Sequence, residues 1–291
     1  MTFYQFIQAV ELKMKEVVNE DTSLCLYTAD KNNGVKRYGI TITQKGINVS
    51  PTIYLEEYYE KFQKGCTIER IVEDIFQLNH QVRFEKSWDE GEVSTFEAVE
   101  NRIIYRLVNF EANRELLKEV PYVPYLNLAI IFYVMLEVNE RGTACMLIRK
   151  EHLEMWNTSI DEIWGKAKEN TWHILPSEFH TMRAIMKSYK KEGNYVGMDI
   201  LYVLTNKIRS FGAAVILYDG CLEMIADFLQ DNYFVLPSSV HEMIIVSEKD
   251  APWGGVGLSE MVKEINRSQV DPEDILSDTT YYYDREKKKL L

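Results

Sequence analysis

The sequence predicts an α+β protein with two modules. A small N-terminal α/β module is expected over residues 1–85. A duplicated ββαβ module over residues 86–291 is expected to form a mixed sheet with helices packed on it. Both helical and strand-like apolar periods occur along the chain. Within the second module a similar phrase occurs twice, as "TWHILPSEFHTM" and as "NYFVLPSSVHEM".

The N-terminal module is predicted as a helix, three strands and two helices. The stretch "FYQFIQAVELKMKEV" has apolar residues at helical spacing, and "SLCLYTA", "GVKRYGITI" and "GINVSPTIY" are typical of strands. Asn33-Gly34 predicts a tight hairpin, because both turn positions tolerate positive φ. Ser50 and Pro51 predict the start of the next helix, and Thr67 predicts the start of another.

A polar and charged stretch, "QVRFEKSWDEGEVSTFE", marks the boundary between the two modules. After it, "NRIIYRLVNF" alternates as a strand does. The segment "EANRELLKEV" predicts a helix that ends before Pro121 and Pro124.

The repeated phrase belongs to a longer internal similarity. Aligning Gly142 with Gly212 places "IIFYVMLEVNERGTACMLI" over "ILYVLTNKIRSFGAAVIL", and each copy has the pattern of a β-hairpin followed by a helix. We therefore predict two ββαβ units, at about residues 125–180 and 196–246, whose hairpins pair into one sheet. The helix "LSEMVKEIN", with Ser259 as its N-cap, and the strand "TTYYYD" are expected to follow.

The composition argues against several classes of partner. The chain has 33 basic and 45 acidic residues, and a net charge of −12 opposes binding to nucleic acid or anionic membranes. The longest apolar stretch is too short to span a bilayer, and the N-terminal helix lacks the apolar core of a signal peptide. The four cysteines are widely spaced, which predicts reduced thiols, with Cys25, Cys145 and Cys221 buried. A cytoplasmic protein is expected.

The repeated phrase contains candidate catalytic groups. A hydrolase would use Ser177, Ser238 or Ser239 as nucleophile and His180 or His241 as base, with Glu242 as the acid that orients His241. Neighbours on one strand point to opposite faces, so the phrase alone cannot form a triad, and no G-x-S-x-G motif is present. The preferred interpretation is structural, with proline ending a strand and serine capping the following turn or helix.

Metal and cofactor sites are not indicated. The five histidines have no H-x-x-x-H or H-E-x-x-H spacing, and the cysteines form no close pairs. The stretch "PWGGVGLSE" lacks the third glycine of a dinucleotide-binding loop, where Glu260 stands instead. We therefore expect a flexible connection there, with no cofactor.

The tyrosines suggest a protein or peptide partner. Tyrosine is enriched at interfaces, although rings covering a sheet are the ordinary alternative. The candidates form two groups in the sequence: Tyr54, Tyr58 and Tyr59, and then Tyr281, Tyr282 and Tyr283.

Four stretches resemble a known family: "INVSPTIYLEEYYEKFQKG", "VPYLNLAIIFYVMLE", "FVLPSSVHEMIIV" and "MVKEINRSQVDPEDILSDTTYYYDR". They are similar to the bacterial domain-of-unknown-function family numbered 5688. "YVPYLNLAIIF" and "RGTACMLIRKEHLEMW" are more distantly similar to UPF0354-like proteins. The resemblance implies bacterial origin and a cytoplasmic location, and it implies no catalytic residue.

Two functions are therefore considered. The expected one is a non-enzymatic binding or adaptor protein, because no convergent catalytic or metal-binding spacing occurs in the sequence. The alternative is a hydrolase with its site at the seam between the two repeat units, with His180 or His241 as the base.

Overall fold

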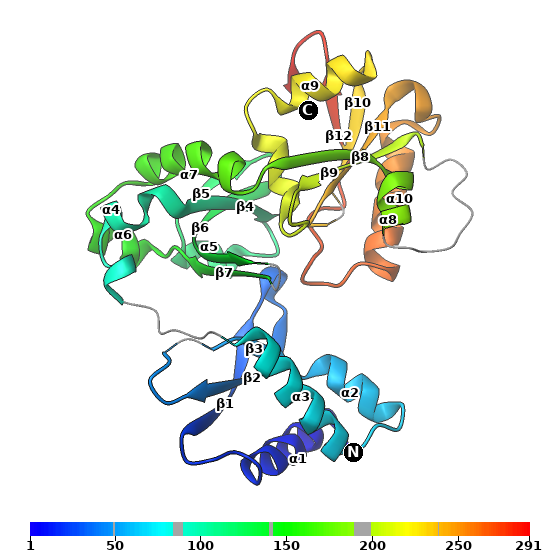
Figure 1. Cartoon of the computed structure of the whole chain (residues 1–291). Coiled ribbons are helices and arrows are strands. Elements are labelled where there is room, and N and C mark those ends of the chain that lie inside the picture. The colour runs from blue at the N-terminus through cyan, green and yellow to red at the C-terminus, as the bar shows by residue number, and fades with distance from the viewer. Residues whose placement is uncertain (49, 84–89, 140–141, 189–198, 238) are drawn as a thin grey trace. The chain divides into compact units, whose positions relative to one another are not determined.

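The computed structural model describes residues 1–48, 50–83, 90–139, 142–188, 199–237 and 239–291 (Figure 1). The chain forms two compact units. The first comprises Met1–Lys31 and Val35–Ser94, and the second comprises Asn32–Gly34 and Thr95–Leu291. The boundary predicted after residue 85 lies outside the described residues.

The first unit has the predicted order of one helix, three strands and two helices. Its elements are α1 (Phe3–Lys15), β1 (Thr22–Asp30), β2 (Lys36–Gln44), β3 (Thr52–Tyr54), α2 (Glu56–Gln63) and α3 (Ile68–Val82). The strands form an antiparallel sheet in the order β1-β2-β3. Apolar side chains of α1, α3 and the sheet form its core, among them Phe6, Val10, Ile40, Ile71 and Ile75.

Local signals explain most of the ends of these elements. Thr2 caps α1 in a reciprocal pair with Gln5, and the Thr67 hydroxyl accepts a hydrogen bond from the third residue of α3. The helix predicted from Ser50 and Pro51 begins instead at Glu56. The intervening residues form β3, where Ile53 pairs with Ile40 of β2.

The second unit contains a four-stranded antiparallel sheet. Its strands are β4 (Ile103–Asn109), β5 (Tyr122–Tyr125), β6 (Leu128–Asn139) and β7 (Gly142–Leu147), and β6 pairs with each of the others. The helices near this sheet are α4 (Phe96–Val99), α5 (Arg114–Glu119), α6 (Lys150–Trp156) and α7 (Ile160–Ile174). Helix α7 packs against β4, where the Thr171 hydroxyl accepts a hydrogen bond from the Tyr105 amide at 3.2 Å.

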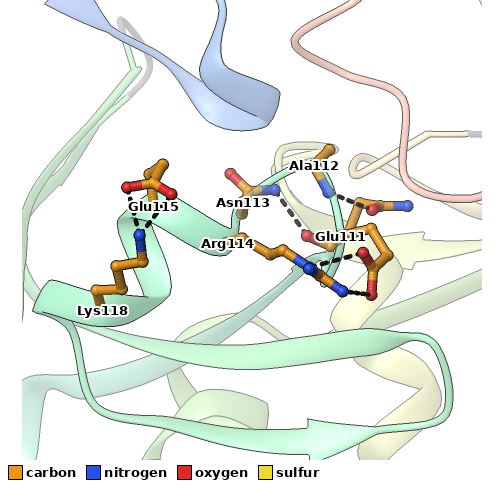
Figure 2. A network of polar contacts seen from close by, with 7 residues as sticks. Glu111, Ala112, Asn113, Arg114, Glu115 and Lys118 are labelled. Carbon is orange, nitrogen blue, oxygen red and sulfur yellow. Dashed lines mark hydrogen bonds and ion pairs between the residues drawn. The ribbon is translucent and has the colours of Figure 1, made fainter.

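The turn from β4 into α5 is held by asparagine side chains. The side-chain nitrogen of Asn113 donates to the backbone carbonyl of Asn109 at 2.8 Å. The side-chain oxygen of Asn109 accepts from the backbone amide of Ala112 at 2.9 Å. Such side-chain bonds satisfy the backbone where a strand ends and a helix begins. Figure 2 shows this turn with the exposed ion pairs Arg114–Glu111 and Lys118–Glu115 beside it.

A six-stranded sheet completes the second unit. Its strands are β8 (Ser177–Thr181), β9 (Leu201–Asn206), β10 (Tyr233–Leu236), β11 (Met243–Ser247), β12 (Tyr281–Asp284) and β13 (Lys289–Leu290), in the order β13-β12-β10-β11-β9-β8. The helices near this sheet are α8 (Met182–Ser188), the 3₁₀ helix η4 (Gly212–Leu217), α9 (Cys221–Leu229) and α10 (Gly254–Ser268). Leu258 and Val262 of α10 pack on Phe234 and Val246 of the sheet.

The α+β class is confirmed, but the predicted mixed sheet is wrong, because the strand pairs in the described part of the chain are antiparallel. The second predicted hairpin is also wrong. Gly212–Leu217 forms the buried 3₁₀ helix η4 in place of a strand. A short buried apolar run has no period that separates the two outcomes. The segments 125–180 and 196–246 therefore differ in element order.

Two predicted helix caps are also wrong. Ser177 lies in β8, and α8 is capped instead by the Thr181 hydroxyl, which accepts from the Ala184 amide at 3.2 Å. Ser259 lies inside α10, which begins at Gly254.

The structure tests the predictions for the cysteines and for membrane-spanning helices. All four cysteines are free, but Cys25 is exposed, contrary to prediction, while Cys221 is buried and Cys145 is half-buried. Within the described ranges, no helix is long and apolar enough to cross a bilayer.

Candidate functional site

The second repeated phrase contains β10, and its residues 239–242 lie between β10 and β11. Its backbone pairs with the segment before β12, because the Val240 amide donates to the Asp274 carbonyl at 2.8 Å and Ser239 forms a bridge with Ile275. This pairing places the Asp274 side chain beside His241.

Both ring nitrogens of His241 have partners. Nε2 lies 3.2 Å from Asp274 Oδ1, and Nδ1 accepts a hydrogen bond from the Phe211 amide at 3.1 Å. The neutral ring therefore carries its proton on Nε2. The hydrogen bond to Asp274 raises the pKa of His241 against the opposing effect of burial. The Phe211 amide also opposes protonation, but a bond to an ionised carboxylate is the stronger of the two.

The loop from β9 into η4 presents Phe211 to this histidine. Arg209 and Phe211 both have φ near +52°, a left-handed conformation that costs about 1 kcal/mol or more per residue. The buried Asn206 holds the loop through a bond from its side-chain nitrogen to the Ser210 carbonyl at 2.8 Å. At Gly212 a Cβ atom would lie 2.6 Å from the His241 carbonyl, so only glycine allows this close approach.

A buried arginine lies next to this loop. Arg106 is 8% exposed, and its guanidinium lies 4.2 Å from the Tyr133 ring and 3.8 Å from the Phe211 ring. Its Nη2 donates to Cys145 Sγ at 3.0 Å, while its buried Nε has no hydrogen-bond partner among the described residues. Each cation–π contact contributes about 0.5–2 kcal/mol. Among the residues that the structure describes, Arg106 has no carboxylate partner.

These residues meet where β4, β6 and β7 face the loops of the six-stranded sheet (Figure 1). The region is called the seam here, and it consists of Arg106, Tyr133, Cys145, Phe211, His241 and Asp274. Burial raises the pKa of Cys145, while Arg106 and Thr143 lower it less. Its thiol is therefore neutral near pH 7 and is a poor nucleophile.

Among the described residues, no serine hydroxyl is placed at His241 as a hydrolase would need. Ser239 Oγ accepts from the backbone amide of His241 at 3.0 Å, and the imidazole contacts no serine hydroxyl within the described part of the chain. Ser238 lies outside the described residues. Ser177 is exposed in β8. Burial raises the pKa of the neighbouring Glu242.

His180 does not join His241. It lies in β8 with its side chain 47% exposed, and its Nε2 is 3.7 Å from Glu178 Oε2. The same carboxylate oxygen lies 3.7 Å from Arg209 Nε. Where the structure describes the chain, no group of three histidine, cysteine or acidic side chains is arranged to hold a metal ion.

The tyrosines predicted as an exposed surface are mostly internal. Tyr58, Tyr281 and Tyr283 are buried, and Tyr54, Tyr59 and Tyr282 are half-buried. Tyr59 packs in a group of rings with Phe3, Phe6 and Phe62. These positions agree better with rings that cover a sheet than with an exposed aromatic surface. A protein or peptide partner stays a prediction, and so do the absence of nucleic-acid and membrane partners and the cytoplasmic location.

Sequence reasoning missed Arg106. A signal was present, because strand alternation places Arg106 on the same face as Ile104 and Val108. A charged side chain between two buried apolar neighbours on one face of a strand is unusual.

A model of a family of unknown function (DUF5688) matches residues 3–285, which confirms the predicted family. No curated protein and no solved structure matches the chain. The distant similarity to UPF0354-like proteins and the bacterial origin stay predictions.

Proposed function

The chain belongs to DUF5688, a family of unknown function, and we propose that it is a non-enzymatic binding protein whose small ligand occupies the seam. This proposal joins the binding role expected from the sequence to the place where the two halves of the second unit meet. The observation that carries it is that the His241 ring is fully hydrogen-bonded within the protein. Both ring nitrogens are already bonded to protein groups, and among the described residues neither nitrogen faces a nucleophile.

The other groups of the seam favour binding. Binding sites are mostly apolar and contain a few convergent polar groups. The rings of Tyr133 and Phe211 provide apolar surface, and Arg106 and His241 provide the polar groups.

A hydrolase at the same place is the second candidate. The His241–Asp274 pair is its supporting observation, because an acid bonded to an imidazole makes up two thirds of a hydrolytic triad. The third member would have to approach His241 Nδ1 and displace the Phe211 amide.

Native mass spectrometry of the purified full chain, incubated with an extract of small metabolites, tests the first candidate. We expect a compound that is retained and recovered unchanged. Phe211→Ala should lose it, because the ring faces the seam. Phe228→Ala is the control, since Phe228 is a 61% exposed ring of the same unit that does not face the seam.

A panel of p-nitrophenyl esters tests the second candidate. Turnover by the wild-type chain that disappears in His241→Ala, with the melting temperature little changed, would establish a hydrolase and end the binding proposal. The absence of turnover together with retention of an unchanged compound would support binding.

A further inference from the structure

The buried charge of Arg106 has no counter-charge among the described residues. Its guanidinium contacts the rings of Tyr133 and Phe211, its Nη2 donates to the sulfur of Cys145, and its Nε has no acceptor among these residues. Buried charges in proteins are normally paired, because unpaired ones lose their hydration without compensation.

The nearby acids are already engaged. Asp274 is bonded to His241, and Glu242 is held by Ser239 and has its pKa raised by burial. The Cys145 thiol is neutral because burial raises its pKa. His241 carries positive charge only when it is protonated, and the bonded Asp274 then balances that charge. Arg106 therefore lacks a negatively charged partner with hydrogen-bond acceptors.

We infer that the ligand of the seam is a small oxyanion, a carboxylate or a phosphate, whose oxygens accept hydrogen bonds from the edge of the Arg106 guanidinium. This inference rests on the proposed binding function and names the class of ligand. The unpartnered Nε marks the edge that receives the oxygen.

The geometry of the seam suits such a ligand. The centroids of the Tyr133 and Phe211 rings lie 4.2 and 3.8 Å from the guanidinium carbon. The N–H groups of arginine point outward in the guanidinium plane, so an oxygen that accepts hydrogen bonds from them approaches in that plane. In that plane the N–H groups of arginine match the spacing of carboxylate and phosphate oxygens. The net charge of −12 repels anions at long range, which is why a local buried cation is needed to hold one.

The experiment uses the full chain at pH 7 with sodium phosphate, sodium acetate and sodium benzoate, each compared with sodium chloride at equal ionic strength. Calorimetric titration and the melting temperature are measured for the wild type and for Arg106→Met, Arg106→Lys and Arg114→Met. Arg114 is the matched control, because it is an exposed arginine already paired with Glu111.

The wild type is expected to bind at least one oxyanion and to melt at a higher temperature with it than with chloride. Arg106→Met should weaken that binding roughly 100-fold, since truncating one partner of a buried charge pair has effects of this order. Arg106→Lys should weaken it about 10-fold by losing the planar fork. Arg114→Met should bind as the wild type does. The phosphate and carboxylate arms identify which oxyanion is preferred.

Arg106→Met without ligand should melt no lower than the wild type, because it replaces an unpaired buried charge by an apolar chain. If Arg106→Met does not fold, the comparison of Arg106→Lys with the wild type and with Arg114→Met replaces it. A wild type that responds to none of the oxyanions beyond chloride overturns the inference. If a neutral compound is retained at the seam and lost in Phe211→Ala but not in Arg106→Met, the binding function stands and the oxyanion is excluded.

Discussion

The two repeated phrases share five of their twelve residues, Leu-Pro-Ser, His and Met, and have different structures. Pro176 is followed by β8, which forms the edge of the six-stranded sheet, and His180 there is 47% exposed. Pro237 is followed by a loop, and the His241 side chain there is 31% exposed and bonded on both sides. One phrase serves as an edge strand, while the other positions a histidine in the seam.

The difference teaches that proline and serine specify where an element ends but not which structure the next residues adopt. After Pro176, residues 177–181 pair along β9, from Ser177 opposite Asn206 to Thr181 opposite Tyr202. After Pro237 the Val240 amide bonds to Asp274 instead. Backbone groups must find partners wherever they are buried, and the partner available in space differs between the two places.

The largest effect is expected from a substitution that disrupts the loop around His241 and leaves β8 intact. In Gly212→Ala the new Cβ would clash with Thr205 Oγ1 and would lie 2.6 Å from the His241 carbonyl. We expect a loss of about 3 kcal/mol in the free energy of unfolding, measured by urea titration. Gly165→Ala in α7 is the control, since its Cβ meets nothing within 4 Å, and a gain of up to about 1 kcal/mol is expected. Equal effects of the two substitutions would contradict the close approach at Gly212.

The next effect compares the two histidines directly. His241→Ala leaves the Phe211 amide and the Asp274 carboxylate without their partners, and we expect a loss of about 2 kcal/mol. His180→Ala removes an exposed ring 3.7 Å from Glu178 and should change stability by less than about 0.5 kcal/mol. Urea unfolding of both variants checks this. Equal losses would mean that His180 and His241 contribute equally to the free energy of unfolding.

The pH dependence of the free energy of unfolding is a further test of the role of His241. The folded-state pKa of His241 is raised by its bond to Asp274. Its contribution is therefore fully present below the unfolded-state pKa of about 6.5 and is lost as the pH rises through the folded-state value. Unfolding free energies of the wild type should fall over this interval, and His241→Gln should remove that fall. A fall of the same size in His241→Gln would assign the dependence to another group.

The smallest expected effect concerns the ends of the first phrase. Thr181→Ala removes the hydroxyl that caps α8 and should cost about 0.5 kcal/mol, at the low end for caps because the site is partly exposed. Ser177→Ala changes an exposed side chain in β8 and should leave the stability unchanged. Thermal unfolding of both variants checks this. A larger loss at Ser177 than at Thr181 would restore the predicted capping role of Ser177.

Prediction from sequence succeeded where the signal is local. The reversal at Asn33 and Gly34 occurs as predicted, with φ of 60° and 68°. The helix after Thr67 and the strand at Tyr281–Asp284 are also confirmed. At Gly212–Leu217 it failed, because "GAAVIL" is apolar throughout and suits a strand as well as a buried 3₁₀ helix.

The candidate site was predicted only partially. His241 was identified from the repeated phrase, but its partners Asp274 and Phe211 are 33 and 30 residues away in sequence, and no local pattern joins them. Arg106 was passed over because a single arginine in an alternating strand normally faces water.

By itself the sequence determined the α+β class, the start of the first and third helices, the tight hairpin and the family. These follow from short-range rules, in which a side chain caps, turns or repeats within a few residues of its own position. Only the tertiary structure decided which phrase became a strand and which became a loop, where η4 forms, and that Arg106 is buried beside Phe211. Those outcomes depend on which distant backbone and side-chain groups are close enough to pair, and that proximity is a property of the folded chain.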